Sequence, residues 1–424
     1  MKTLLAATLA LRGATLIDAT GAKPLPDSLL VVTDGRIVSV GPSSAEALRS
    51  LPAGARQVDV SGRWIIPGLI DAHVHAESDE DLKSMLRWGV TSVRLMAEDV
   101  AKAVRLAADS RNRTDVPDVF PAAPIFTIRG GWWSQGQPAD ANLDRFPATP
   151  EAARAAVGKA KALGSAEIKL MLDDMAWCRP PALPRMRRDV AAALLDEAAR
   201  QGLRASVHAP ELANAKEAVA GGATALAHGV LEPLDAKTIA AMKSRPVFYV
   251  PTMDIFEFLA DTRAFVDSVL ADSAVSGPGG LPRETLARYR SAEYSDGYRR
   301  RYPAFENVRR SLPALYANLK TLREAGVPVA LGTDMWAFPG LGVSIELDLY
   351  VRGGMPPLEA LRAATQTSAR SLAADADRGT LVPGKRADFV VLTADPLADV
   401  KNVRRVQDVY KNGRRAGPAA ETQK

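Results

Sequence analysis

The sequence predicts an α/β protein in which a (β/α)8 barrel of the TIM type carries a small β-sandwich. Three observations lead to this fold class. The middle of the chain alternates short apolar runs with helical patterns, both ends are rich in short β runs, and several apolar runs end in histidine or aspartate. A chain of 424 residues, 47% of them hydrophobic, is long enough to bury a barrel-sized core.

The two ends of the chain are expected to build the sandwich together. Asp34-Gly35 lies between the apolar runs 29–32 and 36–40, and this dipeptide favours a two-residue hairpin turn. The C-terminal end repeats the pattern, with runs at 388–392 and 406–411 followed by Asn412-Gly413. We therefore assign residues 11–66 and 375–424 to one sandwich.

The middle of the chain, residues 67–374, is expected to form the barrel. Helical patterns separate its apolar runs, and one of them, 190–202, ends in Gly202, which suits a helix C-terminus. Eight alternating units fit a closed barrel better than an open doubly wound sheet, which is the alternative. The expected strands are the run that ends in His73 and His75, then 91–96, 124–128, 167–172, 205–208, 225–228, 247–250 and 329–334.

Residues 254–326 are too many for a simple crossover between the last two strands. They combine helical patterns with a Gly-Pro-Gly-Gly stretch at 277–280 and with a tyrosine-rich segment. An insertion at this point would overhang the carboxyl ends of the strands, so we expect a lid. A helical decoration that supports a homo-oligomer is an equal alternative.

Composition argues against a nucleic-acid partner. The net charge of +5 arises from 54 basic and 49 acidic residues, which nearly balance. The basic clusters at 185–188, 299–301 and 404–405 are short and scattered. We interpret them as solvated faces, with a loop that attracts an acidic substrate as the second interpretation.

Neither a membrane nor a disulfide is expected. No apolar run reaches the ~18 residues of a membrane span. Residues 1–10 resemble the opening of a signal peptide, but a strand pattern at 11–18 follows at once, which favours a cytoplasmic protein. The single cysteine, Cys178, cannot form a disulfide within the chain and is interpreted as an inert loop thiol.

All four histidines of the chain stand where apolar runs end. His73 and His75 are two residues apart, so on a strand both side chains leave the same face. His208, His228 and Asp334 each close a later run, and in a parallel barrel such ends open into one mouth. Imidazole and carboxylate are the usual ligands of divalent cations, so these five residues predict a metal site.

Lys169 is the charged residue inside the apolar run 168–172 and is expected to point into the barrel. A protonated amine beside divalent cations would be repelled. A neutral amine can instead add carbon dioxide and become a carbamate, an anionic oxygen ligand. On chemistry alone, a lysine that binds substrate or pairs with a carboxylate remains the alternative.

The sequence resembles the amidohydrolase superfamily, in particular its imidazolonepropionase-like and prolidase-like branch. Three stretches carry the resemblance: DGRIVSVG at 34–41, IPGLIDAHVH at 66–75 and GTLVPGKRAD at 379–388. It implies two divalent metal ions, with zinc favoured and manganese, cobalt or iron as alternatives. It also implies that His73, His75 and Asp334 bind one ion, that His208 and His228 bind the other, and that carbamylated Lys169 bridges them.

The resemblance implies a hydrolase in which a hydroxide that bridges two metals attacks a carbonyl group. Asp334 is then the general acid–base, and His228 contacts the substrate oxygen. We expect the substrate to be a small amide, such as an N-acyl amino acid or a dipeptide. A lactone, carbamate or phosphotriester hydrolase is the alternative. A cyclic-amidine deaminase is disfavoured by Lys169, and an inactive scaffold by the filled ligand positions.

Two departures from the family pattern prevent the transfer of a substrate from relatives. Val93-Arg94-Leu95 stands where relatives often have Val-Arg-Asp, and Gly130-Gly131-Trp132-Trp133 stands where they often have Gly-Gly-His-Gly. Arg94 and Arg129 are candidates to clamp a substrate carboxylate, with salt bridges at the barrel rim as the alternative. An apolar pocket is expected from Trp132, Trp133, Tyr249, Trp336 and Phe338, with core packing as the alternative for Tyr249 and for the two adjacent tryptophans.

Overall fold

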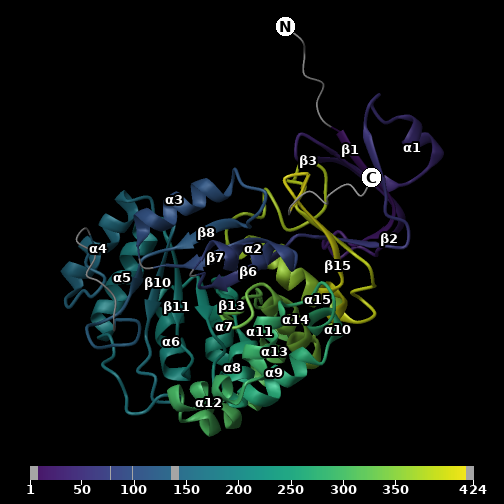
Figure 1. Ribbon diagram of the computed structural model, residues 1–424. Coiled ribbons are helices and arrows are strands. Elements are labelled where there is room, and N and C mark those ends of the chain that lie inside the picture. The colour runs from purple at the N-terminus through teal and green to yellow at the C-terminus, as the bar shows by residue number, and fades with distance from the viewer. Residues whose placement is uncertain (1–7, 77, 98, 135–142, 417–424) are drawn as a thin grey trace.

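The computed structural model describes residues 8–76, 78–97, 99–134 and 143–416, so the expected signal-like residues 1–7 lie outside the described part. Strands from both ends of the chain form one eight-stranded sheet. These strands are β1 (Thr8–Leu16), β2 (Leu25–Thr33), β3 (Arg36–Pro42), β4 (Arg56–Asp59), β5 (Trp64–Pro67), β14 (Phe389–Leu392), β15 (Val406–Lys411) and β16 (Arg414–Arg415). C-terminal β14 pairs antiparallel with N-terminal β5, which confirms a sandwich built from both termini (Figure 1).

The predicted hairpin turns are present in this sheet. Asp34 and Gly35 connect β2 to β3 with φ angles of 50° and 77°. Asn412 and Gly413 connect β15 to β16 with φ angles of 55° and 72°. Both turns need left-handed backbone at two successive positions, which Asn-Gly and Asp-Gly tolerate best.

The barrel follows the sandwich strands. Its strands are β6 (Leu69–Val74), β7 (Val90–Met96), β8 (Asp118–Ala122), β9 (Ile125–Phe126), β10 (Glu167–Met171), β11 (Arg204–His208), β12 (Ala225–Ala227) and β13 (Phe248–Val250). Parallel pairing runs from β6 to β8 and from β9 to β13. The third barrel position differs from the expectation, because β8 pairs with β7 and the short β9 pairs with β10. The prediction of 124–128 therefore found only the second half of this strand.

The barrel closes through an irregular segment, residues 328–334, rather than a regular strand. Tyr249 donates its N–H to Pro328 and accepts the N–H of Ala330, while Ala72 donates to Leu331. Gly332 allows this close approach, because an added Cβ would lie 2.8 Å from His73 Cβ. The eighth position thus pairs with β13 on one side and with β6 on the other.

Helices cover the outside of the barrel. They include α2 (Asp79–Arg87), α3 (Val100–Ser110), α4 (Pro150–Ala162), α5 (Arg188–Arg200), α6 (Leu212–Gly221), α7 (Ala236–Ser244) and α14 (Leu341–Arg352). Helix α5 ends as predicted, since Gly202 follows its C-cap with a φ of 66°. No helix in the described part of the chain is long and apolar enough to cross a membrane.

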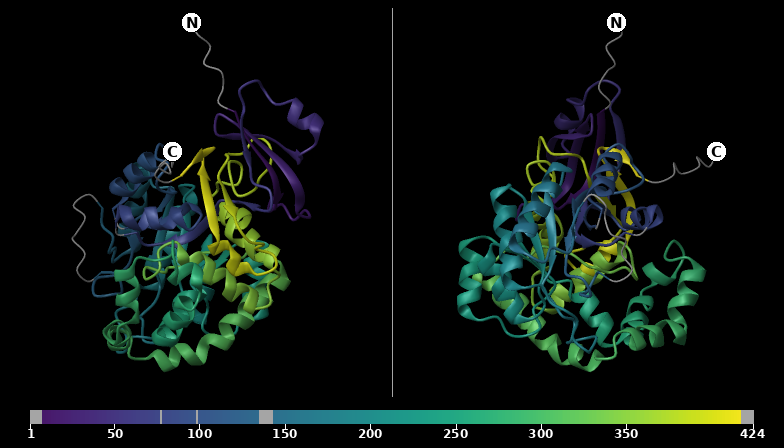
Figure 2. Two further views of the ribbon diagram at one scale, coloured as in Figure 1. Left: turned by 45° about the vertical axis from the view of Figure 1, so that its right-hand side comes forward. Right: turned by 90° about the vertical axis from the view of Figure 1, so that its left-hand side faces the viewer.

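The insertion between β13 and the closing segment is helical. It comprises α8 (Met253–Ala260), α9 (Thr262–Leu270), α10 (Ser273–Ser276), α11 (Arg283–Arg290), α12 (Ala292–Arg301) and α13 (Phe305–Ala325). In two views, α12 lies at the side of the barrel away from the sandwich strands (Figures 1 and 2). The insertion therefore reaches the barrel end opposite the sandwich.

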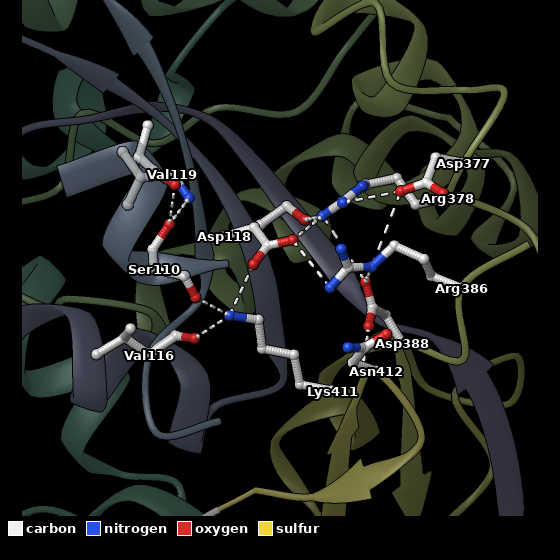
Figure 3. Close-up of polar contacts among 12 residues, drawn as sticks. Ser110, Val116, Asp118, Val119, Asp377, Arg378, Arg386, Asp388, Lys411 and Asn412 are labelled. Atoms are coloured by element: carbon white, nitrogen blue, oxygen red, sulfur yellow. Dashed lines mark hydrogen bonds and ion pairs between the residues drawn. The ribbon is translucent and has the colours of Figure 1, made fainter. Parts of the chain in front are cut away.

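A buried ion cluster joins the sandwich to the near end of the barrel (Figure 3). Asp118, the first residue of β8, pairs with Lys411 of β15 at 2.7 Å, and also with Arg378 at 2.9 Å and Arg386 at 3.2 Å. The Lys411 amine also donates hydrogen bonds to three backbone carbonyls at and just after the C-terminal end of α3, those of Ser110, Arg113 and Val116. These contacts fix the sandwich to the barrel end that lies away from α12.

Candidate metal centre

The six ligand residues predicted from the sequence lie together in the structure. Strand β6 supplies His73, and His75 directly follows this strand. Lys169 lies on β10, His208 ends β11 and His228 follows β12. Asp334 ends the closing segment. Because parallel barrel strands end at one face, their last side chains meet there. All six residues line one cavity of about 220 Å³.

His73, His75 and Asp334 form the tighter group. Asp334 Oδ1 lies 3.8 Å from His73 Nε2 and 3.4 Å from His75 Nε2. One ligand atom from each of the three residues lies within 4.8 Å of the others, a spacing that can hold a metal ion. His73 is fully buried, and neither of its ring nitrogens has a hydrogen-bond partner in the described structure. Such orphaned nitrogens fit metal ligation, because a buried polar atom is costly without a partner.

His208 and His228 lie beside this group, with ring centroids 4.5 Å apart. His208 Nε2 is 2.8 Å from Asp173 Oδ2, and His228 Nδ1 is 3.0 Å from Thr252 Oγ1. Each imidazole therefore has one nitrogen oriented by a protein partner and the other left for a ligand. In metal-binding histidines, the ring nitrogen that does not bind the metal usually forms a hydrogen bond with a protein group of this kind.

Two of the ligand residues have strained backbone. His228 has a φ of 77° and Asp334 a φ of 53°, both in the left-handed region that non-glycine residues rarely adopt. Thr252, which holds His228, has a φ of 47°. Strained residues of this kind cluster at functional sites, where the surrounding fold compensates for a cost of about 1–3 kcal/mol each.

Burial controls the protonation of the site. Burial and the charge of Lys169 lower the pKa of His73 well below its ordinary value and lower that of His75 to about 3. Burial also lowers the pKa values of His208 and His228. The four imidazoles are therefore neutral at neutral pH, which is the form that binds metal ions.

Lys169 lies at the base of the cavity with 2% of its surface exposed, and its amine has no hydrogen-bond partner among the described residues. Burial lowers the pKa of this amine, although the carboxylate of Asp334 opposes the shift. Burial likewise raises the pKa of Asp334, with Lys169 opposing. A lysine held in this way is poised to lose its proton, a condition for forming a carbamate.

Aromatic and apolar side chains form the walls of the cavity. Trp132, Trp133 and Trp336 line it, as expected from the sequence, and the two adjacent indoles stack with centroids 6.0 Å apart. Trp133 also meets the ring of His75 edge-on at 5.1 Å. Further walls that the sequence analysis did not identify are Met171, Met175, Trp177, Cys178, Ile255, Phe256, Leu259, Arg301 and Tyr302.

Both arginines proposed as carboxylate clamps lie off the cavity. Arg94 is 1% exposed inside the barrel, where it donates to the carbonyl of Ala72 at 2.8 Å and to Glu167 at 3.1 Å. Arg129 is exposed and stacks over the ring of Phe146 at 5.3 Å. The expectation that Arg94 and Arg129 clamp a substrate carboxylate is therefore wrong, because neither side chain is part of the described cavity wall.

Two of the expected pocket aromatics are core residues instead. Tyr249 is fully buried, and its hydroxyl accepts the N–H of Val230 at 3.1 Å. Phe338 is buried against Tyr289 and Phe265. The alternative of core packing therefore holds for Tyr249, and the expectation of a pocket residue is wrong for Phe338. Cys178 lies in a turn, as expected of a loop thiol, but it is buried in the cavity wall, and burial raises the pKa of its thiol.

Asp173 is a residue of the site that sequence reasoning missed. It follows β10, and its carboxylate accepts hydrogen bonds from both His208 and the indole of Trp177 at 2.8 Å. Burial alone would raise the pKa of Asp173, but these two hydrogen bonds hold it below its ordinary value. The available signal was its place at the end of a barrel strand.

Comparison with known proteins identifies the family. The amidohydrolase family model matches residues 64–416, which is most of the chain. The chain belongs to the amidohydrolase family. This confirms the resemblance found in the sequence, and with it an enzyme of the hydrolase class.

Relatives of the chain cover nearly its whole length. It is 27% identical to an ochratoxinase from Aspergillus niger over 94% of this chain and 84% of that protein. It is 25% identical to an imidazolonepropionase from Paracoccus denitrificans over 88% of this chain and 90% of that protein. These amidohydrolase relatives match both the barrel and the sandwich segments.

Solved structures confirm the amidohydrolase fold. A Xaa-Pro dipeptidase with bound methionine superposes with a TM-score of 0.75, at 20% identity, over 97% of this chain and all of the other. The structure of A. niger ochratoxinase superposes with a TM-score of 0.74, at 23% identity, over 98% and 96% of the two chains. At this identity the likeness establishes the barrel and sandwich, and the chemistry must be argued from the site.

Proposed function

We propose that the chain is a hydrolase with two divalent metal ions that cleaves a small amide, such as an N-acyl amino acid or a dipeptide. The observation that carries the proposal is the convergence of four neutral imidazoles, a buried lysine without a hydrogen-bond partner and Asp334 on one cavity. The relatives include an imidazolonepropionase and a Xaa-Pro dipeptidase, which supports a carbon–nitrogen bond as the target.

Each ion has its own group of donors in this proposal. His73, His75 and Asp334 would hold one ion, and His208 and His228 would hold the second through the ring nitrogens that Asp173 and Thr252 leave available. Lys169, as a carbamate, would supply an anionic oxygen ligand between the two groups. The buried, uncompensated amine supports this role, because an anionic oxygen ligand would remove an unfavourable buried cation. Zinc suits the histidine-rich donor set best.

The reaction needs one proton relay, which Asp334 supplies. When bound, divalent ions polarise a substrate carbonyl and lower the pKa of water to ~7. Asp334 Oδ1 faces His73 and His75, so Oδ2 accepts the proton of the attacking water. The new carbon–oxygen bond forms, the carbon–nitrogen bond breaks, and Asp334 returns the proton to the departing nitrogen.

Asp334→Asn tests this assignment. We expect kcat to fall at least ~100-fold, because an amide cannot relay the proton, while metal content stays above half of the wild-type value. The measurement is a hydrolysis screen by liquid chromatography and mass spectrometry, with metal content determined in parallel. The library contains dipeptides, N-acyl amino acids, lactones, aryl carbamates and phosphotriesters.

Three results would contradict the proposal in different ways. Activity of Asp334→Asn within tenfold of wild type would remove Asp334 from the proton relay. Turnover of lactones, carbamates or phosphotriesters without any amide would replace the amide by another bond at the same site. Fewer than one ion per chain after loading would favour an inactive scaffold.

A further inference from the structure

The cavity has a second cation besides the buried Lys169. Among the described wall residues, Lys169 and Arg301 are the only lysine or arginine side chains. Arg301 is the last residue of α12, so the helical insertion supplies it rather than the barrel. Lys169 lies buried at the base of the cavity, whereas Arg301 is exposed at its opening. The two cations of the cavity wall therefore differ in depth, since one is buried and the other is in contact with water.

The guanidinium of Arg301 is available to a ligand. No carboxylate of the described chain lies within ion-pair distance of it, whereas its neighbour Arg300 pairs with Glu293 at 2.6 Å. Arg301 instead stacks over the ring of Tyr302, with its guanidinium carbon 5.6 Å from the ring centroid. A guanidinium held on an aromatic face keeps its donors free for a planar anion.

Tyr302 connects this cation to the reacting centre. Its side chain is buried and lines the cavity, and Asp334 lies close enough to influence its hydroxyl. Burial raises the pKa of Tyr302 to about 12, so the phenol is neutral at neutral pH. Two consecutive residues of the insertion thus place a cation near the site of hydrolysis.

We infer that Arg301 binds the free α-carboxylate of the substrate and selects N-acyl amino acids with an apolar side chain. This inference rests on the proposed amide hydrolysis and names the residue that sets its specificity. A guanidinium binds a carboxylate through two parallel hydrogen bonds. The apolar side chain would lie against the indole and aliphatic wall formed by Trp132, Trp133, Phe256 and Leu259.

A matched pair of substrates tests the inference. N-acetylphenylalanine and N-acetylphenylalaninamide differ only in the carboxylate, and release of phenylalanine or phenylalaninamide is measured for each. We expect wild type to prefer the acid by about tenfold or more in kcat/KM, as a charged hydrogen-bonded pair would provide. Arg301→Gln should abolish this preference through a higher KM, with kcat little changed, and Arg301→Lys should restore part of it.

Arg299→Gln is the control variant. Arg299 lies on the same last turn of α12 but stacks over Phe305 and is absent from the described cavity wall, so its replacement should leave the acid-to-amide ratio unchanged. An unchanged ratio in Arg301→Gln, or equal cleavage of both substrates by wild type, would overturn the inference.

Binding separates this inference from the proposed function. If no amide in the set is cleaved, amide hydrolysis fails, but N-acetylphenylalanine can still be titrated by calorimetry because binding needs no turnover. An equal Kd for wild type and Arg301→Gln would then overturn the role of Arg301. A Kd about tenfold weaker in Arg301→Gln alone would support it.

Discussion

The orientation of an imidazole at this centre depends on the residue that bonds its second ring nitrogen. Asp173 bonds His208 in this way, with a distance of 2.8 Å between Oδ2 and Nε2. Its carboxylate, kept ionised by this bond, fixes the proton on Nε2 and leaves Nδ1 as the lone-pair donor. Under the proposed function, Asp173 is therefore a positioning residue for the candidate metal centre.

Asp173→Asn should weaken metal binding about tenfold, at the lower end of the ~10–100-fold range typical of such partners. The amide keeps a hydrogen-bond acceptor but loses the charge that supports the donor nitrogen. Competition with a chromophoric chelator measures the change in Kd for zinc. Asp174→Asn is the matched control, since among the described residues its carboxylate accepts a hydrogen bond from the backbone N–H of Ala176 and not from an imidazole. A wild-type Kd in Asp173→Asn would exclude the positioning role.

At the scale of elements, helix α8 links the metal centre to the helical insertion. Glu346 of α14 accepts the N–H groups of Met253 and Asp254 at 2.8 Å each, which satisfies the first turn of α8. Thr252, directly before the helix, bonds His228, and Ile255 and Phe256 on the helix line the cavity. The start of one helix thus fixes both a ligand and a wall.

This helix start contains two buried carboxyl groups. Asp254 and Glu346 are both fully buried, and Asp254 Oδ2 has no hydrogen-bond partner in the described chain. Burial raises the pKa of both groups, and the nearby Glu346 carboxylate raises the pKa of Asp254 further. Two like charges cannot both be ionised in such a place, so the folded protein keeps a proton there.

The shared proton predicts a pH dependence of stability. Above the ordinary carboxyl pKa of ~4.3, the folded state binds more protons than the unfolded state, so the free energy of unfolding falls as the pH rises. Asp254→Asn removes one charge and offers an amide donor to Glu346. We expect the difference in free energy of unfolding between Asp254→Asn and wild type to shift in favour of the variant by about 1–3 kcal/mol when the pH is raised from 5 to 8.

Urea unfolding of metal-free protein at the two pH values measures this difference. Asp296→Asn, which removes an exposed carboxylate on α12, should show no such pH-dependent gain. Parallel pH profiles for Asp254→Asn and wild type would contradict a shared proton at α8.

At the scale of the whole molecule, the buried ion cluster of Asp118, Arg378, Arg386 and Lys411 connects the sandwich to the barrel (Figure 3). Burial alone would raise the pKa of Asp118, but Arg378, Lys411 and Arg386 outweigh it and hold this pKa below its ordinary value. Asp118 is 1% exposed and Lys411 is fully buried, so the charges are screened by each other rather than by water.

Asp118→Asn should lower the free energy of unfolding by about 3–5 kcal/mol, because it leaves buried cations without their shared anion. Urea denaturation at neutral pH measures the change. Asp59→Asn is the control: it breaks an exposed pair with Arg12, which water screens and which therefore contributes little to stability. A loss no larger than that of the control would mean that the cluster contributes little to joining the barrel and the sandwich.

The sequence by itself determined the barrel and the set of candidate ligand residues that meet at its mouth. His73, Lys169, His208, His228 and Asp334 could be found because strand periodicity and strand ends are local patterns, and a closed barrel brings such ends to one face. The hairpin at Asp34-Gly35 was predictable for the same reason, since its turn requires left-handed backbone at two positions. The sandwich boundaries at 66 and 375 and the movement of the insertion as a lid stay predictions.

Only the tertiary structure decided which side chains reach the substrate space. Arg94 and Lys169 both lie on inward faces of barrel strands, yet Glu167 and the Ala72 carbonyl hold Arg94 below the cavity. Arg301 looked like part of a solvated basic cluster, but the path of the insertion brings it to the cavity wall. Local pattern gives the face of a strand or helix; depth within the barrel and contact across the insertion depend on long-range packing.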